Sequence, residues 1–214
     1  MVTRVGVLIS GRGSNLAALL DDAALPDAPY TIVAVLSNHV GAAGLVCARE
    51  AGVAAYAVER ADFVSRAARQ AEMARLLQAH GVELVVTAGF DQILGPAFVD
   101  AYPERILNIH PSLLPAFAGT LHAPEEALAY GVKVTGCTAH LVTAEVDAGP
   151  IVAQATVPVR DDDTVATLSA RILAEEHRLL PHAVRLLALG MVRVEGRKAV
   201  IIPPLPHPPA HSSS

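Results

Sequence analysis

The first half of the chain alternates short apolar runs with segments whose apolar residues have helical spacing. Alternation of strand and helix predicts a parallel sheet covered by helices, with right-handed crossovers over residues 1–110. No other feature constrains the fold as strongly. The expected strands are residues 4–10, 31–38, 54–58, 83–90 and 104–110, and the expected helices are residues 16–25, 42–51 and 62–80.

The pattern changes in the second half. Two further apolar runs, residues 134–142 and 151–159, are separated by about eight residues, too few for a helical crossover, so we expect them to pair antiparallel. A long helix over 164–189 and a final strand pair near 191–194 and 198–202 follow. The predicted fold is a three-layer α/β architecture with a mostly parallel, twisted, Rossmann-like sheet and an antiparallel strand pair in the C-terminal half.

The composition agrees with strands buried on both faces. Hydrophobic residues make up 52% of the chain and aromatic residues only 4%, with no Trp, so the core must be built from Ala, Val, Leu and Ile. We expect a single domain over residues 1–202. The tail 203–214 is rich in Pro and Ser and is expected to be disordered.

Charge and cysteine content narrow the partners and the compartment. The net charge is −5 without a basic cluster, which argues against a nucleic-acid partner. Cys47 and Cys137 are far apart and form no CxxC pair, which favours a reducing cytoplasm. We expect no leader, because the chain does not begin with a basic segment followed by an apolar run, and no apolar stretch approaches the roughly 18–20 residues that cross a bilayer. We therefore expect a cytoplasmic protein without a membrane partner, a monomer or a homodimer.

Residues 11–15, "GRGSN", join the first strand to the first helix in an arrangement that suits a phosphate. Ser14 or Asn15 is expected to cap that helix. A dinucleotide fingerprint would need a third glycine where Leu16 stands and an acidic residue after the second strand, and a Walker motif would need Gly-Lys-Ser/Thr. A single phosphate on a small substrate fits better than NAD or ATP, and a plain tight turn is the alternative.

Polar residues interrupt the apolar strand that ends near residue 110. Asn108 and His110 are two residues apart, so they share one face at the carboxyl edge of the sheet, where open α/β folds bind ligands. An amide can donate to an oxyanion and a histidine can move a proton. Asp147, in the loop between the two later strands, can hold the histidine. Separately, the three could be a turn cap, a core histidine and a turn residue; together they favour a catalytic set.

Six motifs occur in order up to about residue 202: "SGRGSN", "AGF", "ILGPAFV", "NIHPSLLP", "VDAGPI" and "EEHRLLP". In them the chain resembles the glycinamide ribonucleotide formyltransferases, folate-dependent enzymes of purine synthesis. "NIHPSLLP" alone marks only the wider formyltransferase superfamily, which includes methionyl-tRNA formyltransferases and formyltetrahydrofolate deformylases. The "GSN" turn, together with the expectation of no added domain, narrows the resemblance to the purine-synthesis enzymes.

The resemblance implies a role for each matching position. Gly13, Ser14 and Asn15 would bind the substrate phosphate, and Glu176 its ribose hydroxyls. Backbone groups of 91–94 and 143–147 would grip the pterin. The folate-contacting set would be Arg66, Asp91, Gln92, Ile93, Leu94, Asn108, Val142, Thr143, Ala144, Glu145, Val146 and Asp147.

The resemblance also implies the chemistry. The substrates would be glycinamide ribonucleotide and 10-formyltetrahydrofolate, the formyl donor, and no metal would be required. The amine would attack the formyl carbon. Asn108 and protonated His110 would then stabilise the oxyanion, while Asp147 would orient His110 and help to move a proton to the departing nitrogen. A neighbouring carboxylate favours the imidazolium.

Two segments depart from the family pattern. Asp91 and Gln92 stand where "GFMRIL" would place Met and Arg, which removes a positive charge and adds a negative one near an anionic folate. Ala118 replaces a proline, and one extra residue lies within 119–128, which leaves the role of His122 open. Gln92 and "LPAFAG" are closer to deformylases. A deformylase-like hydrolase and a non-catalytic folate- or nucleotide-binding relative therefore stay as alternatives. His140 could line the site or simply pack in its strand.

Overall fold

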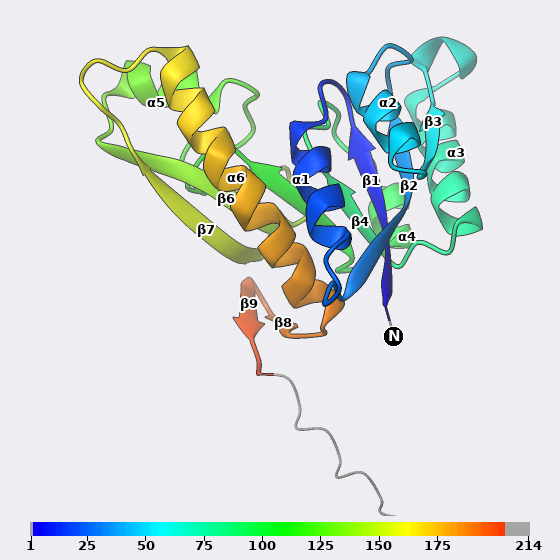
Figure 1. The fold of residues 1–214 in the computed structure, drawn as a ribbon. Coiled ribbons are helices and arrows are strands. Elements are labelled where there is room, and N and C mark those ends of the chain that lie inside the picture. The colour runs from blue at the N-terminus through cyan, green and yellow to red at the C-terminus, as the bar shows by residue number, and fades with distance from the viewer. Residues whose placement is uncertain (1, 204–214) are drawn as a thin grey trace, which may run out of the picture.

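The computed structural model describes residues 2–203 and forms one nine-stranded sheet with helices on both faces (Figure 1). The predicted tail is therefore almost entirely outside the described residues. All nine expected strands form, with ends shifted by a few residues. The strands are β1 (Thr3–Ile9), β2 (Tyr30–Ser37), β3 (Ala54–Ala57), β4 (Leu84–Thr87), β5 (Ile106–His110), β6 (Val134–Leu141), β7 (Ile151–Pro158), β8 (Val192–Glu195) and β9 (Lys198–Ile201).

The strand order is β3-β2-β1-β4-β5-β6-β7-β9-β8. Strands β1 to β5 are mutually parallel, as the alternating pattern predicts. The predicted antiparallel pairing of β6 with β7 is confirmed, and β6 is also antiparallel to β5. The pair β8–β9 is antiparallel, and β9 joins β7 in parallel. The mostly parallel three-layer α/β fold is thus confirmed.

The helices differ from expectation at three places. The helix expected over 62–80 is a 3-10 turn and a later α-helix, because Phe63 and Ser65 have extended backbones and the Ser65 side chain caps the second piece. Two short helices, α4 and α5, were not predicted. The helices are α1 (Ser14–Ala23), α2 (Ala43–Glu50), η1 (Arg60–Asp62), α3 (Arg66–Ala79), α4 (Pro96–Ala101), α5 (Ala123–Tyr130) and α6 (Val165–Ala188).

The core has one apolar cluster on each face of the sheet. Helices α1, α2 and α6 cover one face, and α3 and α4 cover the other. Alternate residues of β1 serve the two clusters: Val7 and Ile9 face the first and Leu8 the second, and all three are fully buried. Helices α1 and α6 lie side by side in front of the sheet (Figure 1).

The fold places the predicted site at one edge. Because β1, β2, β4 and β5 are parallel, their carboxyl ends meet there. The segments that follow Ile9, Thr87 and His110 carry most of the residues that the sequence analysis singled out, so chemistry-bearing side chains gather from distant parts of the chain.

Candidate active site

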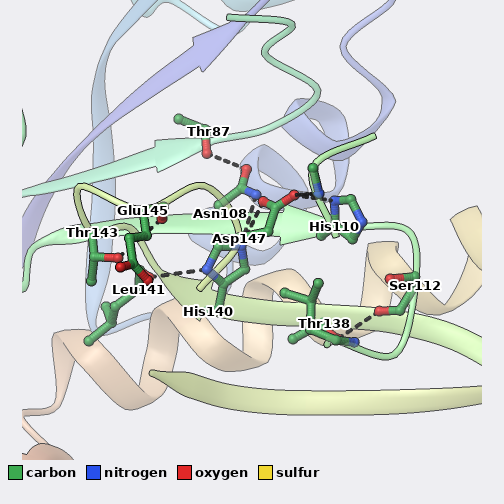
Figure 2. Close-up of polar contacts among 12 residues, drawn as sticks. Thr87, Asn108, His110, Ser112, Thr138, His140, Leu141, Thr143, Glu145 and Asp147 are labelled. Carbon is green, nitrogen blue, oxygen red and sulfur yellow. Dashed lines mark hydrogen bonds and ion pairs between the residues drawn. The ribbon is translucent and has the colours of Figure 1, made fainter. Parts of the chain in front are cut away.

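Asn108 and His110 lie on the same side of β5 and point toward Asp147 (Figure 2). The Asn108 amide is fixed at both ends. Its Oδ1 accepts a 2.6 Å hydrogen bond from the Thr87 hydroxyl on β4, and its Nδ2 lies 3.0 Å from Nε2 of His140 on β6. Thr87 therefore turns the amide so that its NH₂ group faces the His140 ring.

Asp147 reaches this group from the loop between β6 and β7. Its Oδ2 lies 3.4 Å from His110 Nδ1 and accepts a 2.8 Å hydrogen bond from the backbone N–H of Gly119. Its Oδ1 lies 3.5 Å from His140 Nε2. Asp147 has a backbone φ of 51°, a left-handed conformation that non-glycine residues rarely adopt and that is common at functional sites.

The environment of Asp147 keeps its carboxylate ionised. Burial alone would raise the pKa of Asp147, since only 11% of its side chain is exposed. The hydrogen bonds from His140 and the Gly119 amide, together with the two imidazoles, outweigh burial and hold the pKa below its usual value. The site thus has a fixed negative charge between two histidines.

Both ring nitrogens of His110 face acceptors. Nδ1 faces Asp147, and Nε2 lies 2.8 Å from the backbone carbonyl of Phe117. Phe117 has a φ of 55°, again in the left-handed region. An imidazolium can donate in both directions at once. The segment 116–119 is therefore tied to the site at two points, through Phe117 and Gly119.

The glycine turn has the expected position but a different cap. Gly13, with a φ of 78°, is the N-cap of α1, and Ser14 and Asn15 lie inside the helix, so the prediction that either of them caps it was wrong. The αL conformation explains this, because glycine adopts it without the steric cost that a Cβ brings. A Cβ at Gly13 would also approach Gly44 Cα to 2.7 Å. The turn keeps its backbone N–H groups at the start of the helix.

Asn15 and Glu176 are joined across the fold. Asn15 Nδ2 donates a 2.7 Å hydrogen bond to Glu176 Oε2, while Asn15 Oδ1 is buried with no partner among the described residues. Glu176 on α6 is 7% exposed, and burial raises its pKa despite the opposing bond from Asn15. The structure thus brings together two of the predicted substrate-binding residues.

The segment 91–94 borders a cavity of about 500 Å³ shared with Arg66. Asp91, Gln92 and Ile93 line this cavity, whereas Leu94 is buried in the core beneath it. Gln70 holds the segment by donating to the Ile93 carbonyl at 2.9 Å and accepting from the Gly95 N–H at 2.7 Å.

Asp91 does not face the cavity as a free charge. It accepts 2.8 Å hydrogen bonds from the Ser10 hydroxyl and from Asn38 Nδ2, and His39 Nε2 lies 3.3 Å away. Burial would raise the pKa of Asp91, but these three partners hold it below the usual value. The carboxylate therefore ties the segment to the ends of β1 and β2.

The other predicted folate contacts follow β6. Val142 donates its backbone N–H to Ile106, and the Thr143 hydroxyl donates to the Glu145 carbonyl at 3.2 Å. Ala144, Glu145 and Val146 are exposed in the same loop as Asp147. Backbone groups of this loop thus lie beside the catalytic candidates, separate from the cavity at Arg66.

Sequence reasoning missed some partners of the site. Thr87 and Gly119 had no assigned role, and His140 was left between two readings; at 2% exposure it contacts both Asn108 and Asp147. His122 is exposed and pairs with Glu125 on the surface at 3.7 Å. The role of Thr87 could have been suspected from the sequence, because this threonine ends β4 and the next strand along the chain carries two polar residues.

Residues 2–203 contain no group of three or more His, Cys, Asp or Glu side chains arranged to hold a metal ion. Within the same residues, no helix has the length and apolarity needed to cross a membrane.

Comparison with known proteins places the chain in a family. Residues 3–184 match the model described as formyl transferase. A phosphoribosylglycinamide formyltransferase of Mycobacterium tuberculosis is 50% identical over 92% of this chain and 91% of its own length. The trifunctional purine biosynthetic protein adenosine-3 of Bos taurus is 45% identical over 89% of this chain, which spans only 19% of that protein.

Solved structures agree with this result. The crystal structure of glycinamide ribonucleotide transformylase 1 from Symbiobacterium toebii is 51% identical and superposes with a TM-score of 0.92, covering 94% of this chain and 95% of the other. The similarity extends through both the parallel and the antiparallel parts of the sheet. The chain belongs to the formyl transferase family.

Proposed function

We propose that the protein transfers the formyl group of 10-formyltetrahydrofolate to the amine of N1-(5-phospho-D-ribosyl)glycinamide, yielding the N-formyl product and tetrahydrofolate in purine biosynthesis. The names of the similar proteins support this reaction. The observation that carries the proposal is the cluster that Asn108, His110 and Asp147 form with His140 at the carboxyl edge of the sheet. Asp147 lies 3.4 Å from His110 and 3.5 Å from His140, and the Asn108 amide lies 3.0 Å from His140.

Asn108 is proposed to stabilise the oxyanion that forms when the amine attacks the formyl carbon. Because its Oδ1 is held by Thr87, its Nδ2 is the group presented to the reaction. The new bond joins the glycinamide nitrogen to the formyl carbon, and the bond from that carbon to folate N10 breaks. One proton leaves the attacking amine and one reaches N10, so the exchange is balanced.

His110 is proposed to donate to the same oxyanion and Asp147 to hold it as the imidazolium. In the structure, His110 Nε2 is 2.8 Å from the Phe117 carbonyl. A substrate oxygen must replace that carbonyl, so the segment 116–119 moves when the substrate binds. The strained φ of Phe117 favours such a movement, because leaving the left-handed region releases strain.

The phosphate of the acceptor is proposed to bind at Gly13, Ser14 and Asn15, at the N-terminus of α1, where free N–H groups and the helix dipole favour an anion. Glu176 would accept hydrogen bonds from the ribose hydroxyls, with Asn15 setting the direction of its carboxylate. The reduced folate would occupy the edge between 91–94 and 142–147.

The proposal includes a single formyltransferase domain over residues 1–202, small-molecule partners and a cytoplasmic location. Two cysteines without a disulfide in the described residues agree with a reducing compartment. The monomeric or homodimeric state stays a prediction.

One assay tests the reaction against both alternatives. The protein is incubated with 10-formyltetrahydrofolate, with and without glycinamide ribonucleotide, and release of tetrahydrofolate is followed by absorbance. Release that requires the amine supports the transferase. Release without the amine would indicate a hydrolase, and binding without release a non-catalytic relative; either result would contradict the proposal.

A further inference from the structure

Arg69 on α3 is an arginine buried without a matching charge. It is 3% exposed, and one of its terminal nitrogens donates to Gln92 Oε1. Its Nε is buried without a partner, and no Asp or Glu within residues 2–203 forms an ion pair with it. A guanidinium keeps its charge under all ordinary conditions, and buried charges are normally paired. The protein alone therefore leaves this cation incompletely satisfied.

Arg69 lines the 500 Å³ cavity beside segment 91–94, together with Arg60 and Arg66. Asp91 is the one carboxylate among the described lining residues, and Ser10, Asn38 and His39 already engage it. The cavity also lies at the first turn of α3, whose dipole favours negative charge. Its electrostatics thus select an anion.

The rim of the cavity is apolar. Val64 is 99% exposed and Ile93 is 55% exposed, which is unusual for large aliphatic side chains, and Phe63 lies between η1 and α3. Such a rim can cover the faces of an aromatic ring. The matching ligand has an aromatic ring that continues into a carboxylate, which is the chemistry of the aminobenzoyl-glutamate tail of a folate.

We propose that Arg69 is the cation that binds a glutamate carboxylate of the folate donor, with Gln92 orienting its guanidinium. This inference rests on the proposed function. The positive charge comes from α3, and Gln92 serves as its hydrogen-bond acceptor. Arg66, exposed at the start of α3, would add a second contact.

The first test replaces Arg69 while keeping a polar side chain. We expect Arg69→Gln to raise KM for 10-formyltetrahydrofolate about 10- to 100-fold, the usual effect of losing a charge-assisted hydrogen bond, with KM for glycinamide ribonucleotide unchanged. The matched control is Arg75→Gln on the same helix, because Arg75 is exposed and pairs with Glu72 on the surface. The control should match the unmodified protein.

A donor analogue that ends at the aminobenzoyl ring separates charge recognition from damage to the fold. The unmodified protein should bind it at least 10-fold more weakly than the full donor, and Arg69→Gln should bind it as well as the unmodified protein does. Equal losses with both donors, or no loss with the full donor, would overturn the proposal. The comparison of donors in the unmodified protein stands even if the variant does not fold.

The second test moves the charge. In the double variant Arg69→Gln/Gln92→Arg, the cation is placed at position 92, on the same cavity, and we expect at least half of the lost donor affinity to be recovered on a logarithmic scale. Affinity as low as that of the single variant would count against the proposal. Donor affinity is measured by fluorescence titration without the amine. A protein that binds the folate tail through Arg69 but transfers no formyl group would refute the proposed function alone.

Discussion

The charge of Asp147 can be removed with little change in shape by Asp147→Asn. The amide oxygen can still accept from the Gly119 N–H, now 2.8 Å from Oδ2, so the loop keeps this anchor. What is lost is the negative charge 3.4 Å from His110 and 3.5 Å from His140. We therefore expect an effect on turnover without loss of the fold.

The size of the expected effect on turnover follows from the distance between the Asp147 carboxylate and the His110 ring. At 3.4 Å and an effective dielectric constant of about 20, a carboxylate and an imidazolium attract each other by about 5 kcal/mol. Solvent weakens this little, since the side chains are 6% and 11% exposed, but the variant also avoids the cost of burying a charge. The net loss is smaller, so we expect kcat to fall by about 10²- to 10⁴-fold.

The assay is steady-state formyl transfer, followed by the absorbance of the folate product, with circular dichroism to verify folding. Asp161→Asn is the control, because it makes the same change in a surface pair with Lys133 where the carboxylate is 93% exposed. Its kcat should be unchanged. A folded Asp147→Asn protein with kcat within threefold of the unmodified enzyme would refute the assigned role.

Three further variants test other parts of the site. Burial raises the pKa of Glu176, so the stability of the fold falls as the pH rises through the raised pKa of this carboxyl group. The variant Glu176→Gln should therefore have a higher calorimetric Tm than the unmodified protein at pH 8 and the same Tm near pH 4. It should also raise KM for the acceptor. Thr87→Val frees the Asn108 amide and should lower kcat by roughly 2- to 10-fold with KM unchanged, as stopped-flow single turnovers can measure. Asp91→Ala releases segment 91–94 and should raise KM for the donor but not for the acceptor; equal changes in both would argue against a local role.

Sequence reasoning worked best where pattern and burial act together. The nine strands were predictable because they contain runs such as Leu84, Val85 and Val86, which are apolar and fully buried in the sheet. Helix α4 escaped because its six residues are too few to show a helical period. Helix α5 was also missed, although α2, which has the same length of eight residues, was predicted. Helices α4 and α5 each begin with a proline in the first turn, a start signal that can be read only once a helix is suspected.

The candidate site divides in the same way. The spacing of Asn108 and His110 was enough to place them on one face. The contact of Thr87 with Asn108 depends on the register between β4 and β5, which pairs these residues and is not written in either strand. The Gly119 contact comes from a backbone amide after a left-handed Phe117, and no residue type marks such a contact in advance.

The position of β5 has a consequence for amide hydrogen exchange. It is the fifth of nine strands, bonded to β4 on one side and β6 on the other, so its amides can exchange only when the centre of the sheet opens. Asn108 and His110 are thus carried by a slowly exchanging strand, while Asp147 and Gly119 belong to loops that can open locally. Loss of the edge pair β8–β9 would leave Asn108 and His110 in place.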